Sequence, residues 1–223
     1  MTMTITMTKN VIKFFTTLAV MVMVMVIVSS SGNAQALPEL MLTWKAANYA
    51  PPDYAGKVLP TAGTRVDLAL EVIDANRLAD ISRSNISWSV NGEFQQSGVG
   101  LKTFSFNANG AKGDQLVTAS LTYKSRSLDK QIVVPTADPE VAVVGGPDIF
   151  QALMYFFNLS SATQAKFTWT VNGDAVEGSG SNPDVLTLVG DLPAGTPVAI
   201  RVDVQNLLKP LEIATRSVNF VEQ

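Results

Sequence analysis

The chain carries two copies of one short pattern, and their tryptophans stand 81 positions apart. The copies run from Ile86 to Glu93 and from Phe167 to Asp174. In each copy apolar residues alternate with small polar residues up to an Asn-Gly pair, which is typical of a half-buried strand that enters a type I′ hairpin turn. We therefore predict core positions for Trp88 and Trp169. The predicted turn residues are Asn91 and Gly92 in the first copy and Asn172 and Gly173 in the second.

A second pair of segments points to the same duplication. Residues 117–123 and residues 198–204 both alternate apolar and polar side chains, and they too are separated by 81 positions. Two strand pairs with one offset indicate an internal repeat. In a chain of 223 residues, such a repeat predicts two small β domains in tandem and not one enzyme-sized core.

Strand-like segments separated by turn residues recur along the whole chain after residue 36, and none of them has a long helical pattern. This predicts an all-β protein with one β-sandwich in each unit. We place the first unit at 37–134, a linker with two prolines at 135–139, and the second unit at 140–223. The linker is expected to restrict the angle between the units. The aromatic run 150–157 fits a strand or a short helix, and its length favours the strand.

The first 36 residues have the pattern of a secretory signal peptide. Lys9 and Lys13 precede an apolar run at 14–28, and Ala34-Gln35-Ala36 then offers the small side chains that signal peptidase accepts. The alternative is an uncleaved membrane anchor, but a helix of this run spans only ~22 Å of a ~30 Å hydrocarbon core. We therefore expect an exported protein that is periplasmic, on the cell surface or extracellular. It would contact the membrane only through this segment, if the segment is retained.

Composition excludes several classes of chemistry. The chain has no histidine and no cysteine, so imidazole bases, thiolate catalysis and the usual zinc sites are excluded. Without the signal peptide, fourteen basic residues face nineteen acidic ones, and this net charge of −5 argues against nucleic acid as a partner. A hydrolytic pair of carboxylates remains as an alternative. Because Asp67, Glu71 and Asp203 fall on outward strand positions, we expect ordinary pKa values for them, no enzyme activity and no cofactor.

Two further sets of residues are candidates for a site. Loop acids have the oxygen ligands that calcium prefers, but their spacing lacks an Asp-x-Asp-x-Asp motif, so we expect solvated side chains and no metal. These acids are Asp74, Asp80, Glu93, Asp114 and Asp174. Tyr49 and Tyr54 flank Pro51-Pro52 in the Pro/Gly-rich segment 48–63, and they are candidates for binding a peptide or a sugar ring. The alternative is that both rings pack on a neighbouring strand.

A strand with a single tryptophan near the middle of a seven-strand pattern resembles the core strand of immunoglobulin-like sandwiches. The run Trp-x-Val-Asn-Gly-Glu/Asp is also similar to the Trp-x-Phe-Gly-Asp-Gly signature of PKD-type domains of bacterial surface proteins. The resemblance implies two tandem immunoglobulin-like β-sandwiches after the hydrophobic signal helix. It also implies a non-catalytic binding, spacing or adhesion role toward an envelope protein or glycan. A carbohydrate-binding or carboxylate-dependent glycan-active protein and a structural subunit of a surface polymer remain alternatives.

Overall fold

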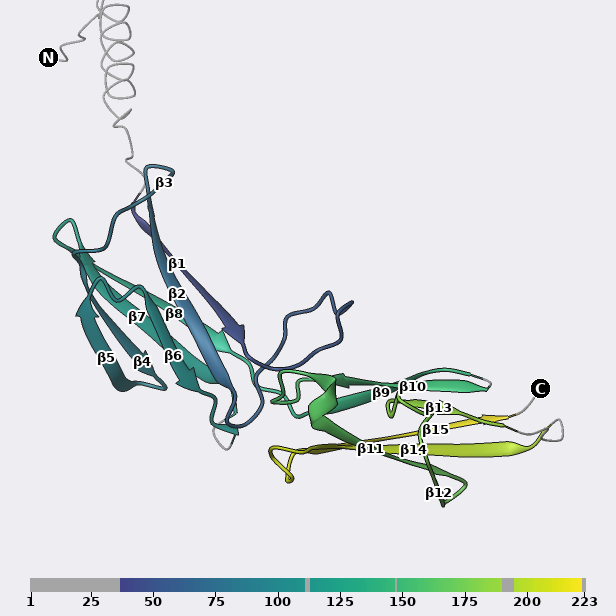
Figure 1. The fold of residues 1–223 in the computed structure, drawn as a ribbon. Coiled ribbons are helices and arrows are strands. Elements are labelled where there is room, and N and C mark those ends of the chain that lie inside the picture. Colours follow the sequence, from purple (N-terminus) through teal and green to yellow (C-terminus); the bar gives the residue numbers. More distant parts are fainter. Residues whose placement is uncertain (1–36, 111–112, 147, 190–194, 222–223) are drawn as a thin grey trace, which may run out of the picture.

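The computed structural model of the protein describes residues 37–110, 113–146, 148–189 and 195–221. The predicted signal segment 1–36 lies outside these residues. Two β-sandwiches follow one another along the chain, and the second is set at an angle to the first (Figure 1). Within the described ranges, no helix combines the length and the hydropathy that crossing a bilayer requires.

The first sandwich consists of two sheets. In one sheet β2 pairs with β1 on one side and with β6 and the short β3 on the other, and the second sheet has the order β5-β4-β7-β8. The strands are β1 (Glu39–Ala46), β2 (Arg65–Asp74), β3 (Arg77–Leu78), β4 (Asn85–Val90), β5 (Glu93–Val99), β6 (Thr103–Asn107), β7 (Gln115–Tyr123) and β8 (Arg126–Val134). Alternate residues of β2, β4 and β7 are buried, so each of these strands has one face in the core.

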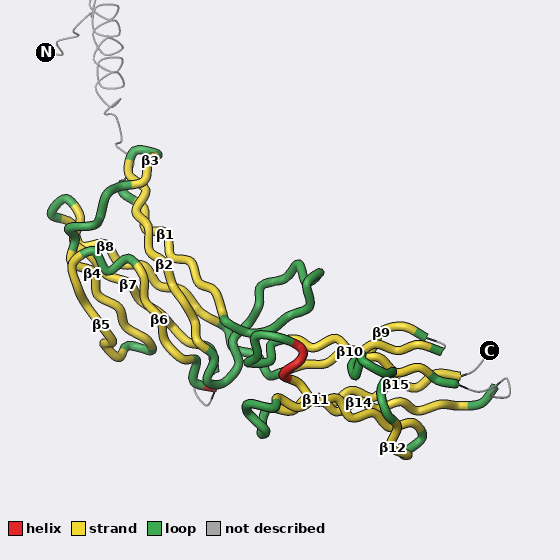
Figure 2. Tube along the Cα trace, viewed as in Figure 1, coloured by secondary structure: helices red, strands yellow, loops and turns green. Residues whose placement is uncertain are grey.

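The second sandwich repeats this arrangement. One sheet has the order β13-β10-β9 and the other the order β12-β11-β14-β15. The elements are β9 (Glu140–Gly145), β10 (Ile149–Tyr155), the 3₁₀ turn η2 (Ala162–Gln164), β11 (Ala165–Val171), β12 (Asp174–Val176), β13 (Val185–Thr187), β14 (Pro197–Asn206) and β15 (Ile213–Val221). The predicted fold class, a tandem of immunoglobulin-like β-sandwiches, is confirmed. Residues 150–155 of the aromatic run lie in strand β10, so the strand interpretation is correct for them, whereas Phe156 and Phe157 follow the end of the strand (Figure 2).

Each sandwich is built around one tryptophan. The side chain of Trp88 is 0% exposed and that of Trp169 is 1% exposed. The indole N–H of Trp88 donates to the carbonyl of Leu101 at 3.0 Å, and that of Trp169 donates to the carbonyl of Pro183 at 2.9 Å. Because a buried indole N–H needs an acceptor, the two sandwiches satisfy the same requirement in the same way.

The structure corrects one detail of the repeat. Trp88 in β4 lies opposite Ala119 in β7, whereas Trp169 in β11 lies opposite Val202 in β14. The partners are therefore 83 positions apart, and the prediction that β7 and β14 share the 81-residue offset is wrong by two. Side chains along a strand alternate with a period of two, so a shift of two residues leaves the same face buried. For this reason the apolar pattern does not distinguish the two registers.

Both Asn-Gly pairs adopt the backbone of a type I′ turn. The φ angles are 53° at Asn91 and 78° at Gly92, and 52° at Asn172 and 93° at Gly173. Each asparagine side chain also accepts a backbone N–H from the neighbouring long strand, from Leu116 at 2.9 Å and from Ala199 at 2.8 Å. The turns are thus held by their own side chains as well as by the strand ladder.

Replacing Gly92 with alanine is expected to lower the free energy of unfolding of the first sandwich by about 1 kcal/mol. A Cβ at this position would meet nothing within 4 Å, so the cost comes only from the positive φ. Urea denaturation measures the change. The matched control is Gly98→Ala in the same hairpin, where the nearest atom would be Leu101 Cβ at 3.8 Å. Equal destabilisation by both substitutions would contradict the backbone explanation.

Candidate functional site

The loop between β1 and β2 crosses over to the second sandwich (Figure 2). The backbone N–H of Tyr49 donates to the carbonyl of Phe157 at 2.8 Å, and the N–H of Phe156 donates to the carbonyl of Tyr49 at 2.8 Å. The ring of Tyr49 packs against the core of the second sandwich. A residue of the segment 37–134 therefore belongs to the interior of the following unit.

Tyr54 also contacts the second sandwich. Its ring meets the rings of Tyr155 and Phe156 edge-on, with centroid distances of 5.5 and 5.8 Å. Burial raises the pKa of the Tyr49 phenol, and the nearby carboxylate of Asp184 adds to the shift. The structure thus places both candidate ligand-binding tyrosines at the contact between the sandwiches, where their rings pack.

Hydrogen bonds of side chains complete this contact. The carboxylate of Glu212 accepts the backbone N–H of Asn158 at 3.0 Å and the hydroxyl of Thr61 at 3.1 Å. The amide of Asn48 donates to the hydroxyl of Thr61 at 3.0 Å and to the carbonyl of Phe156. We call this contact the joint. It consists of Asn48, Tyr49, Tyr54 and Thr61 from the first sandwich and Tyr155, Phe156, Phe157, Asn158 and Glu212 from the second.

A cavity of about 720 Å³ opens beside the joint. The turn between β14 and β15 forms one wall, and Thr61, Asp138 and Pro139 contribute to the other. Leu211 of this turn is 99% exposed, and Leu207 and Leu208 are also exposed. Exposed apolar side chains next to the joint are therefore concentrated on the turn between β14 and β15.

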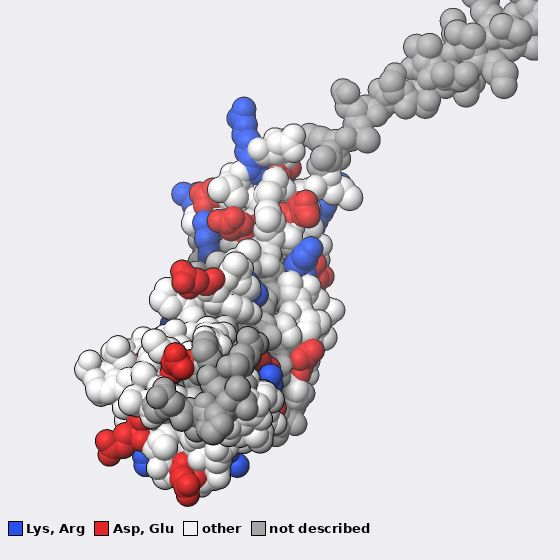
Figure 3. Space-filling model, turned by 90° about the vertical axis from the view of Figure 1, so that its right-hand side faces the viewer, with Lys and Arg blue, Asp and Glu red and all other residues white. Residues whose placement is uncertain are grey.

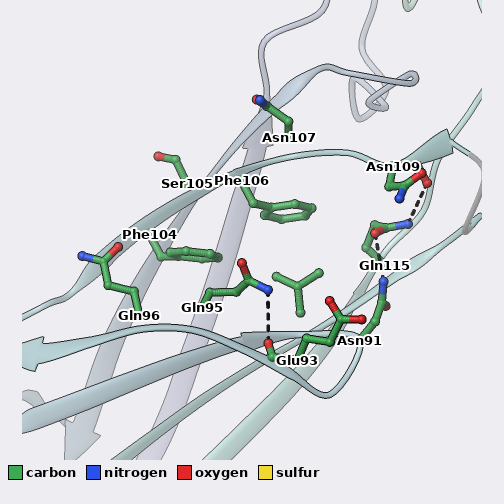
Figure 4. A pocket seen from close by; sticks show the side chains of 11 residues that line it. Asn91, Glu93, Gln95, Gln96, Phe104, Ser105, Phe106, Asn107, Asn109 and Gln115 are labelled. Carbon is green, nitrogen blue, oxygen red and sulfur yellow. Dashed lines mark hydrogen bonds between the residues drawn. The ribbon is translucent and has the colours of Figure 1, made fainter.

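A cleft of about 450 Å³ lies on the open side of the first sandwich, between β5 and β6 (Figure 4). Each of these strands is an edge of a different sheet, so no strand closes this side of the sandwich. We call this cavity the amide cleft because six of its eleven lining residues carry side-chain amides. The lining residues are Val90, Asn91, Glu93, Gln95, Gln96, Phe104, Ser105, Phe106, Asn107, Asn109 and Gln115.

Two phenylalanines of β6 form the apolar surface of the amide cleft. The rings of Phe104 and Phe106 are inclined by only 14°, with centroids 6.1 Å apart. Phe104 in turn stacks on the core ring of Trp88 at 5.4 Å, which fixes its position. Phe104 is 7% exposed and Phe106 is partly exposed, so the cleft is in contact with the hydrophobic core. In Figure 4 the side chain of Gln95 lies opposite both rings.

One wall of the amide cleft is held rigid by hydrogen bonds. The amide group of Gln115, which is 1% exposed, donates to the carbonyl of Asn109 at 3.2 Å and to that of Gly113. Its oxygen accepts from the side-chain amide of Asn91 at 3.0 Å. On the other wall, Gln95 donates to the carbonyl of Glu93 at 3.2 Å. Gln96 and Asn107 are exposed at the rim.

Asp67 and Asp203 do not have the ordinary pKa values that the sequence suggested. Hydrogen bonds from Ser105 and Arg65 lower the pKa of Asp67, and hydrogen bonds from Arg201 and Thr215 lower that of Asp203. The expectation that solvent alone sets these two values was wrong, because an arginine on the same strand and a hydroxyl on the flanking strand supply donors to each carboxylate. A general acid for glycoside cleavage requires a shift in the opposite direction.

Several of the candidate calcium ligands have other partners. Asp74 forms an ion pair with Lys124 at 2.6 Å and accepts from the Tyr123 hydroxyl, and its pKa is lowered as a result. Asp80 accepts the N–H of Ser82. In the part of the chain that the structure describes, no three acidic side chains come close enough to share a metal ion.

Charged side chains are interspersed on the surface. On the face shown in Figure 3, lysines and arginines alternate with aspartates and glutamates over both sandwiches. The exclusion of nucleic acid stays a prediction from composition.

No family model matches the chain, and no curated protein matches it. Solved structures that are similar include the fibronectin(III)-like modules of CbhA from Clostridium thermocellum, at 12% identity over 82% of this chain and 94% of that one, with a TM-score of 0.31. The three N-terminal domains of the Highly Immunogenic Outer Capsid protein (Hoc) of bacteriophage RB49 have 13% identity, coverage of 83% and 59%, and a TM-score of 0.45. The titin domains z1z2 in complex with telethonin have 10% identity, coverage of 82% and 96%, and a TM-score of 0.25. Similarity at this level carries no statement about ligand or partner.

Proposed function

We propose that this chain is an exported, non-catalytic interaction and spacer module of the bacterial cell envelope. In this role the two sandwiches form one stiff unit, and the first presents a binding surface at a fixed orientation. The joint is the observation that supports the proposal. The signal pattern in residues 1–36 supports export, and the absence of cysteine suits a bacterial protein that folds without disulfides.

Relative motion is the default for two domains connected by a short linker. Here the linker is only one of several connections. The N–H of Ala137 in the linker donates to the carbonyl of Pro60 at 3.0 Å, so the linker itself is attached to the loop of the first sandwich. The paired backbone hydrogen bonds of Tyr49 add a second connection and the carboxylate of Glu212 a third. A passive tether would need none of these contacts.

The chemistry of the described residues supports a binding role more than a catalytic one. The carboxylates whose pKa is shifted are all shifted downward, by donors that favour the charged form. With imidazole and thiol absent from the sequence, the chain has few groups that move protons at neutral pH.

The double variant Tyr54→Ala and Glu212→Ala is expected to loosen the joint while both sandwiches stay folded, because neither residue belongs to a hydrophobic core. Single cysteines at the exposed positions Ser97 and Ser217 allow two spin labels to be attached, since the chain has no native cysteine. Pulsed electron paramagnetic resonance should give a narrow distance distribution for the parent chain and a broad one for the double variant.

The matched control for this experiment is Phe94→Ala, because Phe94 is exposed on β5 and takes no part in the joint. It should leave the distance distribution narrow. A broad distribution in the parent chain would contradict the spacer role.

A further inference from the structure

We propose that the amide cleft is a binding site for a neutral oligosaccharide. The inference gives a ligand class to the interaction role proposed for the first sandwich, and it does not depend on the stiffness of the joint. It rests on the chemistry of the lining, on the preformed shape of the cleft and on differences between the two copies of the repeat.

The polar groups of the cleft match sugar hydroxyls. A side-chain amide both donates and accepts hydrogen bonds, and a hydroxyl does the same, so amides pair with polyols without a net charge. Gln95, Gln96 and Asn107 present such groups at the mouth of the cleft. The described lining residues include no lysine or arginine, the side chains that recognise carboxylates and phosphates. With the carboxylate of Glu93 and no basic side chain among these residues, the lining disfavours an anionic ligand, and its amides match a neutral polyol.

The phenylalanines supply the complementary apolar surface. A binding site for a small molecule needs apolar surface beside the polar groups that fix orientation. The nearly parallel rings of Phe104 and Phe106 present such a surface opposite Gln95, and a sugar ring has an apolar C–H face to lay against it (Figure 4). The volume of about 450 Å³ is within the range of ligand pockets, roughly 300–1,000 Å³.

The cleft is formed before any ligand arrives. The hydrogen bonds of Gln115 to Asn91 and to the loop carbonyls set one wall, and the stacking of Phe104 on Trp88 sets the apolar surface. Groups that are already fixed lose less conformational entropy on binding. This matters for a sugar, because its small apolar surface contributes little to the free energy of binding.

The edge of β5 is poorly suited to the alternative occupant, an extended peptide that adds a strand. The register between β4 and β5 shifts between Trp88 and Ser89, and this bulge leaves Gln95 without an opposing residue. A bulge interrupts the regular row of donors and acceptors that an added strand needs, and natural edges use it to block such pairing. The same bulge adds an amide side chain to the wall of the cleft.

The second sandwich does not repeat these residues. By the offset of the tryptophans, Gln95 and Gln96 correspond to Val176 and Glu177, and the equivalent edge strand β12 has only three residues. The core tryptophans and the turns are shared by both copies, so they serve the fold. Of the amides of the cleft, Asn91 recurs as Asn172 and serves the turn. Gln95 and Gln96, at the mouth of the cleft, belong to the first copy alone, as expected for residues that serve a ligand.

Titration of the isotope-labelled chain, residues 37–223, with neutral tetrasaccharides tests the proposal by NMR. The probes are tetramers of glucose, N-acetylglucosamine and mannose, an acidic tetramer of galacturonic acid, and a peptide with the sequence of β5. At least one neutral tetramer should cause saturable shifts in the side-chain amide signals of Gln95 and Gln96. The double variant Gln96→Ala and Asn107→Ala should weaken that binding at least tenfold, and so should Phe106→Ala.

The matched control is Gln131→Ala, which removes an exposed amide from β8 at the opposite edge of the same sheet and should leave binding unchanged. An unchanged melting temperature of the Gln96/Asn107 variant would show that its loss of binding is not unfolding. Absence of saturable shifts with every neutral tetramer would overturn the proposal. Preference for the peptide would overturn it in favour of strand addition, and preference for the acidic tetramer would overturn the neutral class.

The spin-label distances separate this outcome from the proposed function. A narrow distribution without sugar binding would leave the spacer role intact and remove only the glycan. Sugar binding together with a broad distance distribution would support the glycan site and contradict the spacer role.

Discussion

Replacing Trp88 with alanine is expected to unfold the first sandwich. The indole is 0% exposed, stacks on Phe104 at 5.4 Å and donates its N–H to Leu101. Removing a buried aromatic side chain of this size costs ~3–5 kcal/mol, and small domains have only ~5–15 kcal/mol in total. Hydrogen–deuterium exchange of peptides from β4 and β7 measures the loss of protection. The substitution Trp169→Ala should have the same effect on β11 and β14 of the second sandwich.

Two other variants make this result specific. Trp44 lies on the edge strand β1 and is only partly buried. Trp44→Ala should therefore lower the free energy of unfolding clearly less than Trp88→Ala does. Trp88→Phe keeps an aromatic ring in the core and loses only the hydrogen bond and part of the volume, so its effect should lie between the two. Equal costs for Trp44→Ala and Trp88→Ala would show that the core is not organised around Trp88.

The second large effect is expected in a sandwich that is distant in sequence from the substituted residue. Replacing Tyr49 with alanine should destabilise the second sandwich, although Tyr49 precedes every strand of that sandwich, because its ring packs against the second core. The ring is partly buried, so we expect a loss of about 2 kcal/mol, at the low end of the range for large-to-small substitutions. Exchange of peptides from β10 and β11 measures it.

The matched control is Tyr49→Phe, which keeps the ring and the two backbone hydrogen bonds to Phe156 and Phe157 and should be nearly neutral. Loss of protection confined to the first sandwich in Tyr49→Ala would contradict the assignment of this ring to the second core. If the assignment holds, unfolding of the first sandwich by Trp88→Ala should also weaken the second.

Much of the fold follows from local patterns in the sequence. Alternation with a period of two identifies the strands, and it puts Trp88 and Trp169 on buried faces because their neighbours at two-residue spacing are apolar. Asn-Gly identifies the turns because both positions need positive φ, which few other residue pairs accept. Repetition of these patterns identifies two units, since each pattern depends only on residues close together in the chain.

The candidate sites could not be predicted in the same way. The packing of Tyr49 and Tyr54 on the second sandwich depends on residues about a hundred positions away, and proline-rich segments have no periodicity that shows where a ring will point. The amides of the cleft come from β5, β6, the start of β7 and the turns beside them, and only the packing of the two sheets brings these residues together. The bulge that adds Gln95 has no marker in the sequence.

The sequence by itself determined the all-β class, the tandem repeat, the core tryptophans and the turns, because short-range periodicity and backbone preference encode them. Only the tertiary structure decided the register of β14 against β11, the joint between the sandwiches and the amide cleft. A shift of two residues leaves the apolar pattern unchanged, and contacts between edges and loops leave no periodic trace in the chain. The features that relate the two sandwiches and shape their surface therefore come from long-range packing.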